Sequence, residues 1–305
     1  DLSKCDVATL NGLELMKTFI FDVWASGDKD VYNYIISWFA GLFTNLKGIN
    51  MVAMAMVAKQ GTGKGFLLQF MKYLISGVNV CESQGIASIT QKHNTAIQNK
   101  RLVVINEMSS TRDEFKSNFD KIKTYISDPV VQIEPKGINP YQINNISNFL
   151  LFTNHRDSII LEESDRRYAV FEMSDCHIND VAYFTMLQKA CFNQDVADAF
   201  YTYLLDFEAV PVRNIPTTTL RTEMMTLSKS TPLKFLDAIT TGEYDAFDED
   251  LVETSARNLY EKFTAWCCQN GERVVSGTKF GTIISTILTK RRTERGIVYV
   301  LPVRV

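Results

Sequence analysis

The sequence lacks the features that mark a metal centre, a disulfide framework or a membrane protein. Its six cysteines form no C-x-x-C pair, and its three histidines show no spacing typical of metal ligands. The most apolar early run, residues 51–58, is far shorter than the roughly 20 residues that span a bilayer. No signal-peptide pattern follows Asp1. We therefore expect reduced core thiols, no membrane segment, a cytoplasmic location and a piece of a longer polypeptide.

Neither sign of charge dominates the chain. The 32 basic and 35 acidic residues give a net charge of −3, so the field of the whole molecule would not attract a polyanion. Any binding of nucleic acid must therefore be local. Hydrophobic residues make up 46% and charged residues 22% of the 305 residues, which excludes a largely disordered chain and predicts two or three domains.

Apolar spacing divides the chain into three predicted parts. Residues 1–48 have helical spacing and predict a small helical domain. Residues 49–229 alternate short apolar strands with helices, which predicts an α/β sheet covered by helices and ending in a Pro- and Thr-rich connection. Residues 230–305 carry two helical patterns and a closing strand, which is consistent with a winged-helix-like α+β domain.

A glycine-rich segment between a predicted strand and a predicted helix gives the strongest chemical signal. Such glycines let backbone N–H groups turn around phosphates, the helix N-terminus adds its dipole, and a lysine, here Lys64, reaches the β and γ oxygens. The alternative is a glycine-rich turn without a ligand. The predicted nucleotide-binding residues are Gln60, Gly61, Thr62, Gly63, Lys64, Gly65 and Phe66.

Two positions depart from the usual phosphate-loop pattern. Ala58 replaces the first glycine, and Gly65 replaces the hydroxyl residue that ligates magnesium. The second departure matters more, because Mg²⁺ would have to be held by water, by Thr62 or by an acidic group elsewhere. The sequence thus predicts ATP and Mg²⁺ as cofactors. It identifies no direct protein ligand for the metal, which we expect to bind with the nucleotide near Glu107.

Two later predicted strands end in polar residues. The strand from residue 102 ends in Asn106 and Glu107, and we expect it to lie beside the loop-bearing strand, with Glu107 as the catalytic base and Asn106 holding a metal-bound water. The strand from residue 148 ends in Asn154, which could contact the γ-phosphate or the attacking water. Surface turns and strand-capping residues are the alternatives.

Arg166 and Arg167 adjoin a further apolar strand. A guanidinium from a neighbouring subunit can stabilise the transferring phosphoryl group, so one of the two is predicted to be an arginine finger; a solvated or ion-paired arginine pair is the alternative.

Alternating apolar residues around Pro-Lys-Gly, at 135–137, predict a β-hairpin with Lys136 and Gly137 at its tip. A basic tip can grip a backbone phosphate without reading sequence.

Within about 110 residues these motifs resemble the superfamily 3 helicases, most closely the helicase part of viral, phage and plasmid (poxvirus-type) primase-helicases. The Gly-Lys-Gly ending of the loop also occurs in that family. The resemblance implies an AAA+-like P-loop NTPase core that forms a homo-oligomeric ring, usually a hexamer. Lys64, Glu107 and Asn154 would act in one subunit, with Arg166 or Arg167 from the next.

The resemblance further implies an ATP-dependent DNA helicase for replication that moves on single-stranded DNA, with Lys136 lining the channel. It makes residues 1–48 a collar or oligomerisation domain and suggests an attached primase or polymerase domain before Asp1, in the host cytoplasm for a viral or phage protein. Other functions stay open: an ATP-switched initiator or loader, a catalytically weak or inactive nucleic-acid-binding scaffold motivated by Gly65 and Asn106, and, least favoured, a metabolic kinase. Basic residues Lys290, Arg291, Arg292 and Arg295 form either a further DNA contact or a solvated helix end.

Overall fold

A computed structural model describes residues 2–106, 112–156, 158–162, 165–245, 247, 252–294 and 296–301. The chain divides into two compact units, Asp1–Met225 and Thr226–Val305.

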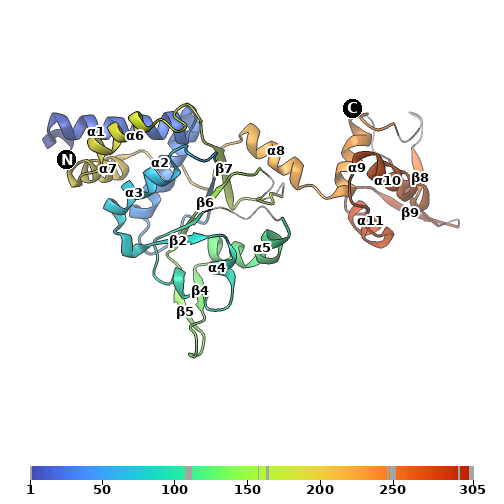
Figure 1. The fold of residues 1–305 in the computed structure, drawn as a ribbon. Coiled ribbons are helices and arrows are strands. Elements are labelled where there is room, and N and C mark those ends of the chain that lie inside the picture. Colours follow the sequence, from blue (N-terminus) through green and yellow to red (C-terminus); the bar gives the residue numbers. More distant parts are fainter. Residues whose placement is uncertain are drawn as a thin grey trace. The chain divides into compact units, whose positions relative to one another are not determined.

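The first unit is built on a five-stranded parallel sheet, which confirms the predicted mixed α/β fold (Figure 1). The strand order is β2-β3-β6-β1-β7, and every neighbouring pair is parallel. The strands are β1 (Ala53–Val57), β2 (Val80–Gln84), β3 (Leu102–Asn106), β6 (Asn148–Thr153) and β7 (Tyr168–Glu172). Because β6 lies between β1 and β3, the expectation that the strand ending at Asn106 lies beside the loop-bearing strand is wrong.

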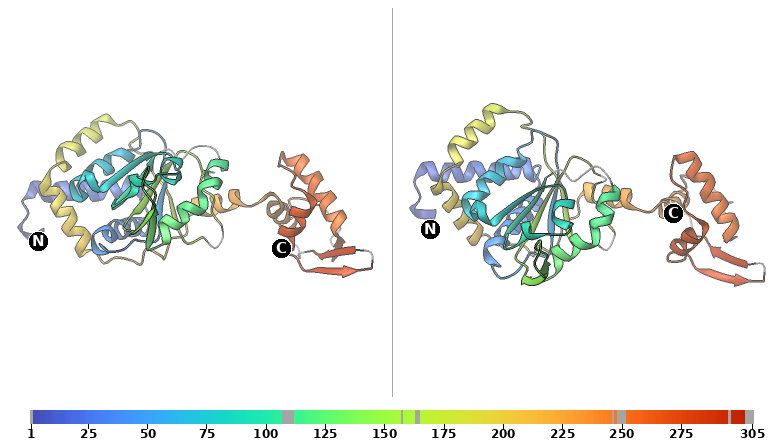
Figure 2. Two further views of the ribbon diagram at one scale, coloured as in Figure 1. Left: turned by 90° about the horizontal axis from the view of Figure 1, so that it is seen from below. Right: turned by 60° about the horizontal axis from the view of Figure 1, so that its bottom comes forward.

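Helices cover both faces of this sheet, as Figure 2 shows. The central strands are largely apolar and buried, so alternate side chains enter two separate cores. One core is formed with α1 (Val7–Phe19), the π-helical turn η2 (Ile20–Trp24), α2 (Lys29–Thr44), α3 (Lys64–Ile75), α6 (Val181–Cys191) and α7 (Gln194–Asp206). The other is formed with α4 (Ala87–Thr90), η4 (Thr95–Ile97), α5 (Arg112–Ser127) and α8 (Thr219–Ser228).

The N-terminal helices confirm the helical spacing of residues 1–48. Asp6 and Asp28 cap α1 and α2, each accepting hydrogen bonds from backbone N–H groups of the first turn. Both helices share one continuous core with the sheet, and Trp38 Nε1 donates to the carbonyl of Val52 at 2.8 Å. The predicted boundary at residue 48 therefore does not coincide with a boundary between compact units.

Arg101 fastens α2 to the amino edge of the sheet. Its buried guanidinium donates to five backbone carbonyls, at 2.7–3.0 Å, and the desolvation lowers its pKa. Three of these carbonyls lie at the end of α2 or directly after it, where the helix dipole favours a cation. The acceptors are the carbonyls of Gly41, Leu42, Asn45, Gly48 and Ile146.

An antiparallel hairpin, β4 (Val130–Ile133) with β5 (Tyr141–Asn144), projects from the sheet and confirms the predicted hairpin (Figure 1). Its base is anchored by the buried Asn94, which donates to the carbonyl of Gln132 and accepts from the N–H of Glu134, each at 2.9 Å. Lys136 and Gly137 lie in the exposed turn, where Gly137 has φ +75°.

The second unit packs three helices against a small antiparallel sheet of order β8-β10-β9. Its core centres on Phe235, Phe263 and Phe280, one from each helix. The elements follow in the order α9 (Thr231–Thr240), β8 (Glu253–Ser255), α10 (Ala256–Asn270), α11 (Gly277–Ile284), β9 (Lys290–Thr293) and β10 (Gly296–Val300).

All six cysteines are free, but only Cys191 and Cys267 are buried, and Cys176 and Cys268 are exposed, so the expectation of core thiols holds for part of the set. No helix within the described ranges is both long and apolar enough to span a bilayer.

We predict that Arg101→Met destabilises the first unit by at least about 3 kcal/mol, since hydrogen bonds to charged groups contribute about 1.5–3 kcal/mol each and buried carbonyls would lose their partners. Urea unfolding followed by tryptophan fluorescence measures the change. The control is Lys47→Met, at an exposed position of the neighbouring loop, which should change stability by less than about 0.5 kcal/mol. Equal stability of the two variants would contradict the anchoring role.

Candidate functional site

The glycine loop, residues 58–65, joins the central strand β1 to the N-terminus of α3. Gly61 and Gly63 have φ of +85° and +90°, a region that side chains with a Cβ rarely adopt. A Cβ on Gly61 would collide with the side chain of Asn179, and one on Gly63 would lie 2.7 Å from the ring of Phe184. Both glycines are therefore required by the path of the backbone.

The N-terminus of α3 has the form of an anion-binding site. Its N-cap is Gly63, which supplies no side-chain acceptor for the N–H groups of the first turn. Those groups and the helix dipole together favour a negative ligand. Thr62 is buried and its hydroxyl donates to the carbonyl of Lys59 at 2.9 Å, so the structure does not support Thr62 as a metal ligand.

Lys64 and Asn154 meet at this helix end. Lys64 is the first residue of α3, and its Nζ donates to Asn154 Oδ1 at 2.9 Å and to the carbonyl of Ala58 at 3.3 Å. The contact follows from the sheet, because Val57 pairs with Thr153 in register and the chain leaves both strands at the same edge. The structure thus brings two of the predicted site residues together.

Asn106 ends β3, two strands away from β1, which corresponds to about 10 Å across the sheet. It is half-buried, and its carbonyl accepts from the N–H of Gly85 at 2.9 Å. Glu107 lies outside the described residues. At Gly65 a Cβ would meet no atom within 4 Å, so a larger side chain could be accommodated there.

Arg166 and Arg167 lie at the opposite edge of the sheet. The carbonyl of Arg167 accepts from the N–H of Ala53, the first residue of β1, whereas the glycine loop follows its last residue. Four residue steps of strand separate the two edges, about 13 Å. Arg166 is exposed and Arg167 half-buried. Within one chain these arginines do not approach the loop.

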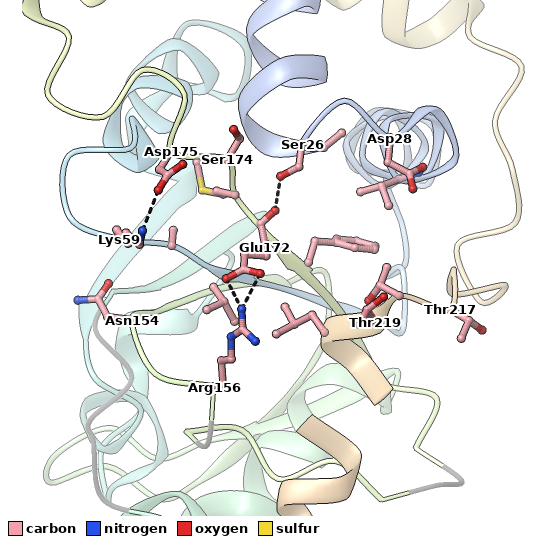
Figure 3. A pocket seen from close by; sticks show the side chains of 18 residues that line it. Ser26, Asp28, Lys59, Asn154, Arg156, Glu172, Ser174, Asp175, Thr217 and Thr219 are labelled. Carbon is pink, nitrogen blue, oxygen red and sulfur yellow. Dashed lines mark hydrogen bonds and ion pairs between the residues drawn. The ribbon is translucent and has the colours of Figure 1, made fainter. Parts of the chain in front are cut away.

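An open cleft of about 770 Å³ lies beside the glycine loop (Figure 3). Phe171, Val31 and Leu220 give it apolar walls, and Ser26, Asp28, Thr217 and Thr219 add polar groups. It is lined by the ends of β1 and β7, the turn before α2 and the start of α8. Sequence reasoning missed this cleft, since its lining comes from segments far apart in the chain.

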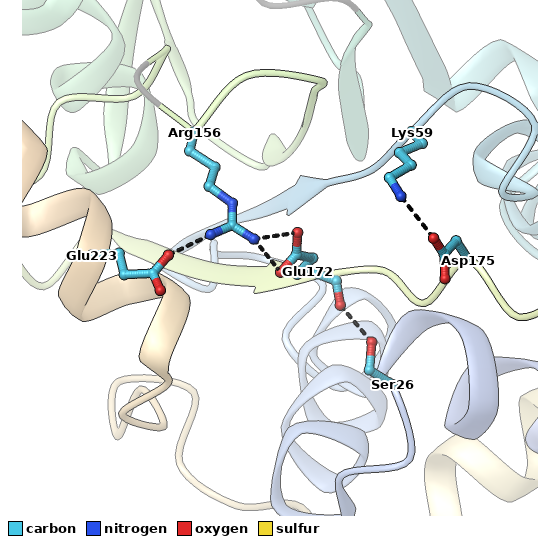
Figure 4. A network of polar contacts seen from close by, with 6 residues as sticks. All are labelled: Ser26, Lys59, Arg156, Glu172, Asp175 and Glu223. Carbon is cyan, nitrogen blue, oxygen red and sulfur yellow. Dashed lines mark hydrogen bonds and ion pairs between the residues drawn. The ribbon is translucent and has the colours of Figure 1, made fainter.

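Two sets of ion pairs include residues that line the cleft (Figure 4). Arg156 contacts both carboxylate oxygens of Glu172, at 2.8 and 2.9 Å, and also pairs with Glu223 of α8. Lys59 pairs with Asp175 at 2.7 Å, and this ammonium holds the pKa of Asp175 below its usual value. The paired carboxylate of Glu172 raises the pKa of Arg156.

Of these residues, Lys59 and Arg156 had a signal in the sequence: Lys59 lies within the glycine loop, and Arg156 follows Asn154 by two positions. Their carboxylate partners lie in segments that carry no motif. The ion pairs are solvent-exposed, and such pairs contribute little to stability.

Comparison with known proteins gives a consistent set of relatives. A family of unknown function (DUF5906) matches residues 56–167. A DNA primase-polymerase of Nitratiruptor phage NrS-1 is 28% identical over 165 residues, which is 53% of this chain and 22% of the phage protein. The chain thus spans about a fifth of the length of that relative. It is homologous to a part of a phage primase-polymerase.

Solved structures of the C-terminal region of the NrS-1 protein share the fold of this chain. The apo structure of the NrS-1 C-terminal region has a TM-score of 0.71 at 18% identity and covers 94% of this chain and 75% of its own chain. A second apo structure of that region, its A form, has a TM-score of 0.68 at 18% identity, covering 95% of this chain and 75% of its own. At this identity the match shows a shared fold.

We predict that Gly63→Ala destabilises the first unit, because a left-handed residue with a Cβ costs about 1–2 kcal/mol and the ring of Phe184 must also shift. Gly65→Ala is the matched control: it adds the same methyl group two positions away, in open space on a helix, and should be neutral or stabilise by up to about 1 kcal/mol. Thermal unfolding compares the two. A lower Tm for Gly65→Ala than for Gly63→Ala would show that the loop has another path.

Proposed function

We propose that this chain binds and hydrolyses ATP with Mg²⁺ as the AAA+-like motor module of a DNA helicase, translocating on single-stranded DNA within a homo-oligomeric ring. One observation carries the proposal: Lys64 Nζ and Asn154 Oδ1 lie 2.9 Å apart at a helix N-terminus that has no side-chain cap. A lysine, an amide and open N–H groups at the edge of a parallel sheet are the components that bind and position a triphosphate.

Each residue then has a distinct task. Lys64 binds the β and γ oxygens, with the N–H groups of residues 60–66 around the phosphates. Asn154 is within reach of the same point, where it would orient the γ-phosphate or the attacking water. Glu107 is the proposed general base. The cleft beside the loop, with Phe171 and polar groups at its rim, offers space for the remainder of the nucleotide.

The site offers few protein groups that could bind Mg²⁺ directly. Gly65 offers no hydroxyl, and Thr62 is buried and already donates to a backbone carbonyl. Bound Mg²⁺ would neutralise charge on the β and γ phosphates. Asn106 would hold one of its waters from the end of β3, and Glu107 follows it.

The position of the two arginines supports a ring. Arg166 and Arg167 lie about 13 Å from the loop end of the sheet in their own chain, by the length of β1. A head-to-tail contact between copies would bring the arginine edge of one chain to the loop edge of the next. One of the two would then stabilise the charge on the transferring phosphoryl group.

The β4–β5 hairpin supports contact with nucleic acid. Its base is fixed by Asn94, and its turn presents Lys136 and Gly137 to solvent. An exposed ammonium on a rigid base can hold a backbone phosphate without base recognition. We place single-stranded DNA at this turn, with Lys136 lining the channel of the ring.

The relationship to a phage DNA primase-polymerase supports a role in DNA replication, and an attached primase or polymerase domain. The second unit supports the winged-helix-like assignment, since its helix–strand–helix–helix–strand–strand order and three-stranded antiparallel sheet are those expected of such a domain. A catalytically weak scaffold is the second candidate, favoured by the missing hydroxyl at Gly65.

We predict that turnover of ATP rises with protein concentration and single-stranded DNA, and that Lys64→Ala and the double variant Arg166→Ala/Arg167→Ala each abolish it. Because the site would be shared between chains, mixing the two inactive variants should restore turnover: the loop of one then meets the arginine of the other. Steady-state phosphate release measures this. A mixture as inactive as its components would remove the shared site, and wild-type turnover equal to that of Lys64→Ala would favour the scaffold.

We predict that Gly65→Ser lowers the Mg²⁺ concentration needed for half-maximal ATP binding by several-fold, because a hydroxyl at this position can ligate the metal. Gly65→Ala serves as the matched control without a ligand atom. Binding of a fluorescent ATP analogue across a Mg²⁺ titration gives the readout even if turnover is slow. Equal midpoints for the two variants would count against a metal near residue 65.

A further inference from the structure

The two arginines before β7 differ in how far the fold already engages them. Arg166 is exposed, and within the described ranges its guanidinium makes no hydrogen bond or ion pair. Arg167 is half-buried, and its carbonyl accepts from the N–H of Ala53 at 2.7 Å. Its Nε also donates to Ser127 Oγ at 3.4 Å. Arg167 is thus tied to the fold, whereas the donors of Arg166 are available to a ligand.

Asp165 fixes the backbone directly before these arginines. It is only 5% exposed, and its N–H donates to the carbonyl of Glu162 at 2.9 Å. Its Oδ1 accepts from the N–H of Arg167 at 2.8 Å. Its carbonyl accepts from Arg221 Nη2 of α8 at 2.6 Å. Because the N–H, the carbonyl and the side chain of Asp165 are all engaged, the path of the chain through residues 165–167 is set.

The stability of the fold does not by itself account for a carboxylate at position 165. The second carboxylate oxygen, Oδ2, is buried and has no hydrogen-bond partner in the part of the chain that the structure describes. The same holds for Arg221 Nε. Buried charged groups destabilise a protein unless their polar atoms are paired, and native structures contain few unpaired ones. A pair of such groups directly beside Arg166 and Arg167 therefore points to a functional task.

Arg221 occupies a fixed position, because α8 is packed on β7. Leu220 and Met224 of α8 are buried in the same core as Val170 of β7. The hydroxyl of Thr218 donates to the carbonyl of Val170 at 3.3 Å and accepts from the N–H of Arg221 at 3.2 Å. The hydrogen bond from Arg221 therefore ties Asp165 to a helix that is itself held on the sheet.

We propose that Asp165 and Arg221 are positioning residues that present Arg166 as the arginine acting on the phosphoryl group bound by the neighbouring chain. This inference rests on the proposed function. It gives the two arginines separate tasks: Arg167 anchors the segment, and Arg166 extends from it. A group that stabilises transition-state charge must be held in place before the reaction, and a displacement of about 1 Å can cost about 100-fold in rate.

The test measures phosphate release by the full 305-residue chain. Asp165→Ala removes the acceptor for the N–H of Arg167, and Arg221→Met removes the donor on α8; we expect each to slow turnover about tenfold. Asp165→Asn keeps an acceptor and should slow turnover by at most about twofold. Arg257→Met, the control, removes an exposed arginine of the second unit and should leave turnover unchanged. Binding of a fluorescent ATP analogue should be equal in all four, because the glycine loop is intact.

Mixtures identify which half of a shared site is damaged. Lys64→Ala supplies an intact arginine segment without a working loop, and Arg166→Ala/Arg167→Ala supplies the reverse. If Asp165→Ala lacks only a well-placed arginine, Lys64→Ala restores its turnover and the double variant does not. Restoration by the double variant, or by neither, would place the damage at the loop or in the fold and would overturn the proposal. If circular dichroism shows that Asp165→Ala is unfolded, Arg221→Met takes its place in the same mixtures.

Single replacements test the assignment within the pair. Arg166→Ala should be as inactive as the double variant, whereas Arg167→Ala should keep at least about a tenth of wild-type turnover. Equal losses, or a larger loss in Arg167→Ala, would overturn the assignment. A wild type no faster than Lys64→Ala would end the proposed function and this inference with it. An active wild type beside an equally active Asp165→Ala would overturn the inference alone.

Discussion

The contact between Lys64 and Asn154 depends on how the N-terminal ends of β1, β3 and β6 are held together. Arg101 precedes β3 and binds five carbonyls around the end of α2 and near β6. Asn148, the first residue of β6, accepts from the N–H of Asn50 and its own N–H donates to the carbonyl of Arg101. A shift of one residue in strand register would turn every side chain to the other face of the sheet. These hydrogen bonds therefore fix which residues lie at the carboxyl ends of the strands.

The fixed register determines which side chains meet at the carboxyl ends of β1 and β6. With the strands in register, the chain leaves β1 and β6 side by side, and the lysine that opens α3 meets the amide that follows β6. The backbone between β1 and α3 turns through Gly61 and Gly63, both with positive φ, and Gly63 at the N-cap has no side chain to cap the N-terminus of α3. Buried polar contacts at one end of the sheet thus support an anion-binding arrangement at the other end.

The sequence was informative where a pattern is local. Helical spacing in residues 1–48, the hairpin around Lys136 and the strand–glycine–helix order around Lys64 each appear in the structure. Strand order was not predictable, because periodicity carries no information on which parallel strands are neighbours, and β6 accordingly separates β3 from β1. The cleft was missed for the same reason, since Arg156, Glu172 and Glu223 meet only through the fold. No local sequence pattern predicted that Arg101 is buried.

The sheet also separates two kinds of residue that the proposed ATP hydrolysis needs together. Parallel strands send all their carboxyl ends to one edge, which here carries Lys64 and Asn154, while the segment that enters β7 must begin at the other edge, which carries Arg166 and Arg167. No side chain is long enough to span a strand of five residues. If both edges act on one phosphoryl group, a second copy of the chain has to supply one of them. Assembly would then be a condition for turnover, and a chain alone would bind nucleotide without using it.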